Sequence, residues 1–158
     1  MKKKITSIFL MMILLFMSVS VSGIDVLAKA NYINNKNFRG TFTLDGEECT
    51  FESGGYEVVI GNVSSGGTVK LQLHRWSANA GHMSDTDIIT KKIKGNKVSF
   101  IFTDSYDGSK EKATITFNKD KTIFLRVKVI EEAEFSGYSL EIDKTRFERA
   151  SKKHKLYE

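Results

Sequence analysis

Polar and apolar residues alternate at a period of two through most of this 158-residue chain. Phe42 lies between Thr41 and Thr43, and the same rhythm returns over residues 98–103 and 123–129. Successive side chains of a β-strand point to opposite faces of a sheet, so this pattern predicts strands with one buried and one solvated face. Turn residues such as Gly, Asn and Asp separate these segments. About eight or nine strands are expected, and no interior segment offers the helical crossover that a parallel sheet needs.

An all-β fold is therefore predicted: an antiparallel up-and-down barrel, with a β-sandwich as the alternative. Pairing of the first strand with the last would remove the exposed edges of the sheet, which this proline-free chain has few other means to protect. After the last strand, Asp143 can cap a short C-terminal helix over residues 144–154, lying on the outside of the barrel or across one mouth. The expected interior is aromatic and contains Phe42, Phe51, Tyr56, Phe100, Phe102, Phe117 and Tyr138.

The N-terminal segment has the features of an export signal. Three lysines at residues 2–4 precede an apolar run over residues 5–21, and Ala28-Lys29-Ala30 then supplies the small-x-small pattern of a cleavage site. We therefore predict a signal peptide over residues 1–30 and a single barrel domain over residues 31–158, with residues 31–37 and 152–158 as flexible ends. An uncleaved membrane anchor is the alternative, because the run approaches the ~18 residues that span a bilayer.

The charge of the chain depends on that leader. The whole chain carries +5, with 24 basic and 19 acidic residues, and removing four lysines and one aspartate leaves 20 and 18, or +2. The basic composition therefore does not predict a nucleic-acid partner. A short basic tail remains at residues 152–155, either as a solvated end or as a contact for an anionic cell wall or membrane surface. The Lys- and Asn-rich composition is typical of secreted or cell-wall-associated proteins of Gram-positive bacteria.

A small exported barrel of this kind resembles the calycins, in particular bacterial lipocalin-like proteins. The likeness is carried by Phe38-Arg39-Gly40-Thr41-Phe42, which is similar to the Gly-x-Trp motif of the first lipocalin strand, with Phe42 in place of the tryptophan. Arg146 is similar to the lipocalin arginine that packs over that aromatic ring. The resemblance covers residues 38–142 and implies a barrel that binds a ligand.

A barrel of about eight strands either fills itself with side chains or holds one small ligand. Because so many aromatic rings point inward, we expect a packed core or a small apolar pocket. The preferred interpretation is a secreted, non-enzymatic, monomeric binding domain without a cofactor, and without stable membrane insertion once the leader is cleaved. It would contact a small apolar ligand or an extracellular protein through loop and rim residues, namely Trp76, His82, Met83 and Tyr106.

Two other functions stay open. A secreted metal-assisted hydrolase could use His74, His82 and Asp85 around the loop over residues 77–87, since two imidazoles and a carboxylate can hold a catalytic zinc. The spacing fits no known ligand motif, however, and His74 is expected to face outward. An inhibitor of an extracellular enzyme is the third possibility. The loop over residues 104–108 offers oxygen ligands for calcium, but an Asp-Gly hairpin turn explains it as well.

Overall fold

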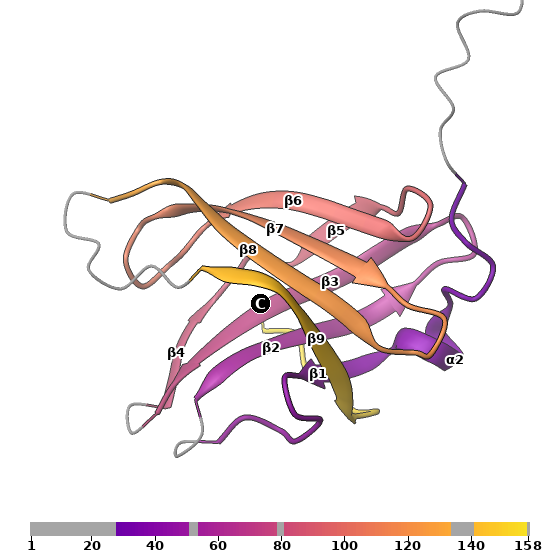
Figure 1. The fold of residues 1–158 in the computed structure, drawn as a ribbon, viewed down its shortest axis with the longest axis horizontal. Coiled ribbons are helices and arrows are strands. Elements are labelled where there is room, and N and C mark those ends of the chain that lie inside the picture. Colours follow the sequence, from indigo (N-terminus) through magenta and orange to yellow (C-terminus); the bar gives the residue numbers. More distant parts are fainter. Residues whose placement is uncertain (1–27, 51–53, 79–80, 134–140, 158) are drawn as a thin grey trace, which may run out of the picture.

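The computed structural model describes residues 28–50, 54–78, 81–133 and 141–157, with only the backbone described for residues 81–83. The predicted leader lies outside the described residues up to position 27, as do Phe51 and Tyr138 of the predicted core. In the described part, one short helix, α2 (Asn35–Phe38), precedes nine strands (Figure 1). The strands are β1 (Gly40–Thr43), β2 (Gly55–Val63), β3 (Thr68–Ser77), β4 (Gly81–Asp85), β5 (Ile89–Lys92), β6 (Lys97–Thr103), β7 (Lys110–Phe117), β8 (Ile123–Glu131) and β9 (Ile142–Ser151).

The strands form one antiparallel sheet that curls into a half-barrel (Figure 1). Its order is β4-β3-β2-β1-β9-β8-β7-β6, and β5 pairs with the half of β3 that β4 leaves free. Neighbours along the chain are mostly neighbours in the sheet, as expected for strands joined by short turns. The first strand pairs with the last, with Thr43 opposite Glu148. The predicted all-β antiparallel architecture is therefore confirmed.

The concave face of the sheet holds a single hydrophobic core. Inward residues alternate along the strands, as in Val69, Leu71 and Leu73 of β3 and in Ile123, Leu125 and Val127 of β8. The ring of Phe38 packs edge-on against Phe117, with 5.0 Å between ring centroids. Of the aromatic residues predicted inside, Phe42, Tyr56, Phe100 and Phe117 are buried in this core, and Phe102 packs against it partly buried.

The predicted C-terminal helix over residues 144–154 is wrong. Strand β9 occupies most of this segment and pairs with both β8 and β1. The side chains follow a period of two, because Phe147 is buried in the core while Arg146 and Glu148 on either side are exposed. Tertiary context overrides the weak helical spacing, since only a strand at this place can supply hydrogen-bond partners to β1 and β8 together.

The C-terminal segment after β9 covers the convex face of β1–β3 (Figure 1). Residues 152–157 contact this face through backbone groups: the Thr41 hydroxyl donates to the Lys153 carbonyl, and the Gln72 amide both donates to and accepts from the Tyr157 backbone. This face of β1–β3 is therefore buried rather than solvated. The described parts of both segments expected as flexible ends therefore make contacts. In the N-terminal segment, Ile33 is fully buried in the core.

Candidate functional site

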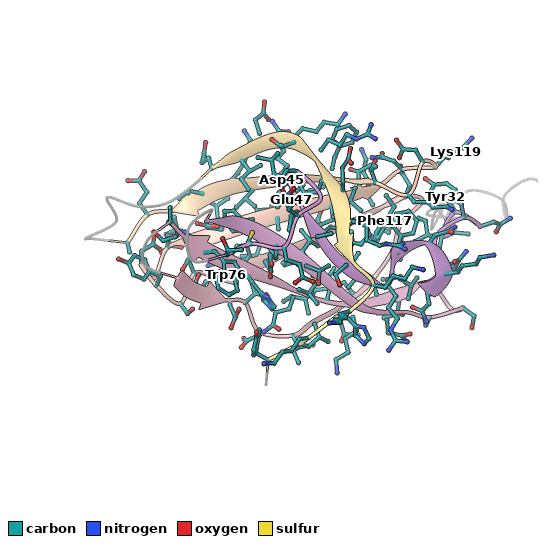
Figure 2. The ribbon with its side chains drawn as sticks, turned by 90° about the horizontal axis from the view of Figure 1, so that it is seen from below. Tyr32, Asp45, Glu47, Trp76, Phe117 and Lys119 are labelled. Carbon is teal, nitrogen blue, oxygen red and sulfur yellow. The ribbon has the colours of Figure 1, made fainter. Side chains whose placement is uncertain are left out.

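Two of the predicted contact residues lie at one end of the half-barrel. Trp76, near the end of β3, pairs with His82 of β4 and is visible at one end of the molecule in Figure 2. Tyr106, in the loop after β6, is 50% exposed. Arg75 joins the two elements, since its guanidinium donates to Asp104 Oδ2 at 3.0 Å and lies 5.8 Å from the centroid of the Tyr106 ring. Trp76 points to the other face of β3 from Arg75 and lines a pocket with Cys49, Glu57 and His74, so the structure does not bring the side chains of Trp76 and Tyr106 together. The side chains of His82 and Met83 lie outside the described residues.

His74 faces outward, on the convex face, as expected. It is not solvated, however, because the C-terminal segment covers it and leaves it only 2% exposed. Its Nδ1 lies 3.4 Å from Glu57 Oε2, and its Nε2 lies 3.2 Å from Gln72 Oε1 and 3.6 Å from Asp85 Oδ1. The Tyr157 ring lies over it, with 5.0 Å between ring centroids. Both ring nitrogens therefore face protein groups.

The metal hypothesis joined His74, His82 and Asp85. His74 and Asp85 are brought together, whereas the side chain of His82 is not described. Within the described residues, no group of three or more His, Cys, Asp or Glu side chains is arranged to hold a metal ion. The oxygen ligands of the loop over residues 104–108 are used within the turn: Asp104 Oδ1 accepts from the Tyr106 amide and Asp107 Oδ1 from the Ser109 amide.

Glu57 is the centre of a polar network under the C-terminal segment. Its carboxylate accepts hydrogen bonds from the Cys49 amide and from His74, and Trp76 lines the same pocket. Although burial raises it, these hydrogen bonds hold the pKa of Glu57 below its ordinary value. For the neighbouring thiol, burial and the charges of Glu57 and Asp45 all act in one direction and raise the pKa of Cys49 to about 12. Cys49 is therefore a poor nucleophile, and the shallow pocket of about 280 Å³ around it has no activated thiol.

Sequence reasoning missed a second polar cluster, inside the rim that Tyr106 borders. Glu111 points inward from β7 and is fully buried beside Tyr56 and Ser109, whose hydroxyl lies 3.3 Å from Glu111 Oε1. Burial, with the nearby charges of Asp104 and Asp107, raises the pKa of Glu111 to about 7. The sequence does contain a signal for this cluster. Glu111 falls on the same inward phase of the alternation as Ala113, where a charged residue is rarely found.

The arginine that packs over Phe42 is Arg149, not Arg146. The Arg149 guanidinium lies 5.6 Å from the centroid of the Phe42 ring. Arg146 is on the exposed face of β9, where it pairs with Asp120 and Glu148 at 3.3 Å each. The period-two phase set by Phe147 places residue 149 inward and residue 146 outward, and the helical interpretation of this segment concealed that phase.

Arg149 also lines a pocket of about 590 Å³, a depression in the surface. It lies between the end of α2, the start of β1 and the chain after β9, and its lining is strongly basic. The residues are Asn35, Lys36, Arg39, Arg149, Lys152, Lys153 and His154. The basic tail noted in the sequence therefore forms one wall of a pocket whose other wall comes from residues more than a hundred positions earlier.

Compared with protein-family models, with curated proteins and with solved structures, the chain shows no significant match. In the described part, no helix is both long and apolar enough to cross a membrane. The architecture is compatible with a lipocalin-like barrel, and the site has to be interpreted from its own residues.

Proposed function

We propose that this protein is an exported, non-enzymatic binding domain of lipocalin-like form that contacts an extracellular protein through its rim and outer surface. The observation that carries the proposal is the filled interior. Beside Tyr56, Leu73 and Phe102, on the concave side of the sheet, the described residues leave a cavity of only about 10 Å³. That volume is about the minimum for one water molecule, so an apolar ligand would find no space without moving core side chains.

The rim at Trp76 and Tyr106 supports a protein partner. Tyr, Trp and Arg are the residues most enriched where protein interfaces gain their binding energy. Here the exposed Tyr106 lies against Arg75 at one end of the sheet, and the half-buried Trp76 lies on the opposite face of the same strand end. Arg75 donates a hydrogen bond to Asp104, and Asp104 accepts a second one from the Tyr106 amide. These bonds preorganise the rim, which reduces the entropy lost on binding.

The test is cross-linking of the exported chain to the extracellular proteins of the cells that produce it, followed by mass spectrometry. A single partner captured by the wild type should be reduced at least about fivefold by Tyr106→Ser, because an exposed interface tyrosine typically contributes more than ~1 kcal/mol. Ile101→Ser is the matched control, since Ile101 is 53% exposed on β6 but faces away from the core.

Three results would contradict the proposal. Stoichiometric, saturable uptake of an apolar fluorescent probe would place the ligand inside the barrel. Equal loss of capture in the Tyr106 and Ile101 variants would show that the rim is not the binding surface. Hydrolytic activity abolished by His74→Gln in a folded variant would favour the metal-assisted hydrolase instead.

A further inference from the structure

The basic pocket of about 590 Å³ is a different feature from the rim. Gly40 at the start of β1 pairs with Ile60, whereas Trp76 pairs with Gly55 at the other end of β2. The pocket therefore lies toward the opposite end of these strands, next to α2. A ligand bound in this pocket would not involve the rim, so binding there would be a function in addition to the proposed one.

Charge is the first property that defines a ligand for this pocket. Five cationic side chains line it, namely Lys36, Arg39, Arg149, Lys152 and Lys153, and its lining includes no carboxylate. Within the described residues, none of the five takes part in an ion pair, in contrast to Arg75, Arg126 and Arg146 elsewhere in the molecule. Such a concentration of one sign of charge raises the local concentration of anions.

Unsatisfied donors are the second property, and they are independent of the first. Arg149 Nε and Nη2 are buried and have no hydrogen-bond partner among the described residues, and the same holds for His154 Nδ1. The Arg39 guanidinium donates to His154 Nε2, at 2.8 Å from Nη2, so Nε2 acts as the acceptor and Nδ1 carries the proton. Three N–H groups of pocket-lining residues thus lack an acceptor, which is rare for buried donors.

The geometry of these donors indicates the chemistry of the acceptor. A guanidinium presents Nε–H and Nη–H as a planar fork that matches two oxygens of a phosphate or carboxylate. Stacking on the Phe42 ring holds the guanidinium of Arg149 in place. Five cations favour a group with more than one negative charge, and the pocket volume is typical of a small-molecule site rather than of a single ion.

We propose that this pocket binds the phosphate group of a phosphate ester. Arg149 and His154 donate hydrogen bonds to the phosphate oxygens, and Lys36 and Lys152 supply charge from opposite walls. The rest of the ester occupies the remaining volume of the pocket. The phosphate can belong to a soluble ester or to a lipid headgroup, which share this chemistry.

The experiment uses the chain purified after export by the cells that produce it. Calorimetric titration with glycerol 3-phosphate should give saturable binding, whereas glycerol and, at matched ionic strength, sodium chloride and sodium acetate should not. Arg149→Gln should weaken the affinity at least about tenfold, and the exposed pair Lys36→Gln with Lys152→Gln about as much, since each removes charge-assisted contacts. Lys112→Gln, which removes an exposed lysine outside the pocket, should leave the affinity unchanged.

A second arm distinguishes the sources of the phosphate. Vesicles of phosphatidylglycerol, compared with vesicles of phosphatidylcholine, are titrated with the same variants. Binding that depends on Lys36 and Lys152 supports the proposal in either arm. Binding of glycerol 3-phosphate indicates a soluble ester, and binding of phosphatidylglycerol vesicles indicates a lipid headgroup. The Lys36 and Lys152 pair keeps the test valid if the Arg149 variant does not fold. The proposal is overturned if neither arm saturates, if acetate or chloride binds equally well, or if Lys112→Gln weakens binding as much as the pocket variants.

Discussion

A buried carboxyl group at Glu111 should make the stability of this protein fall as the pH rises through neutrality. Burial raises the pKa of Glu111 to about 7 in the folded chain, from an ordinary value of 4.5. The folded state therefore binds a proton that the unfolded state has already released between these two values. The stabilisation of the folded state by this bound proton is complete only below about pH 4.5, and it is lost as the pH rises to 7 and above. The direction is opposite to that of an ion-paired carboxylate.

The magnitude follows from the same two values. The interval between them corresponds to at most about 3 kcal/mol of unfolding free energy. About 2 kcal/mol of this is lost between pH 5.5 and pH 8.5, because the unfolded carboxyl is already mostly ionised at the lower pH. The structural reason is that Ser109 offers only one hydrogen bond to the carboxyl, while Asp104 and Asp107 place negative charge nearby.

Glu111→Gln isolates this effect, because glutamine has the shape of the neutral carboxyl and does not titrate. Urea unfolding at pH 5.5, 7.0 and 8.5, followed by the fluorescence of the single tryptophan, measures it. When the pH is raised from 5.5 to 8.5, the unfolding free energy of the variant relative to that of the wild type should increase by about 1–2 kcal/mol. Glu132→Gln, at an exposed position just after β8, should show no such change. A stability difference between wild type and Glu111→Gln that is independent of pH would refute the reasoning.

Two further perturbations test other parts of the fold. Gly40→Ala should lower the unfolding free energy by at least about 2 kcal/mol, because Gly40 has a φ of +141° and its added Cβ would collide with the Ser151 carbonyl of β9. Gly66→Ala is the control for the urea measurement, because its added Cβ would make only an ordinary contact, at 3.9 Å from Ser64 Oγ. Alkylation of Cys49 by iodoacetamide at pH 8 should be at least about tenfold slower than in the urea-unfolded chain, because its pKa is raised to about 12. Equal rates would contradict that value.

Alternation alone was sufficient to predict the fold class. Residues such as Val98 and Phe100 of β6 or Ile123 and Leu125 of β8 follow a period of two, which depends only on the geometry of a strand. The argument that a long meander must protect its edges predicted a closed barrel in which the first strand meets the last. Strands β1 and β9 do pair, but the sheet ends at β4 and β6 and is a curled half-barrel. Both inferences are local or topological, and neither needs knowledge of specific tertiary contacts.

The ends of the chain could not be predicted in this way. The segment over residues 144–151 has one strongly apolar inward residue, Phe147, so its periodicity does not distinguish helix from strand. What decides is that β1 and β8 both need a partner. Similarly, His74 alternates with inward Leu73 and was expected to be solvated. It is buried because the chain some eighty residues later lies over it, a contact that leaves no trace in the local sequence.

The basic pocket likewise depends on contacts between residues that are far apart in the sequence. The composition of the chain therefore does not reveal this local concentration of positive charge. The predicted mature chain over residues 31–158 has a nearly balanced charge, which does not predict a polyanion as partner. The fold nevertheless gathers cations from α2, from the residue before β1, from β9 and from the chain after it, with no carboxylate in the lining. The strand that replaces the expected helix is what makes this possible. An extended segment over residues 142–151 runs along β1 and delivers the basic tail beside Arg39, with Arg149 on the inward phase over Phe42. A helix over residues 144–154 could not follow the ladder of β1, and its basic residues would have been distributed around its circumference. The correction to the secondary structure and the basic pocket therefore have one physical origin.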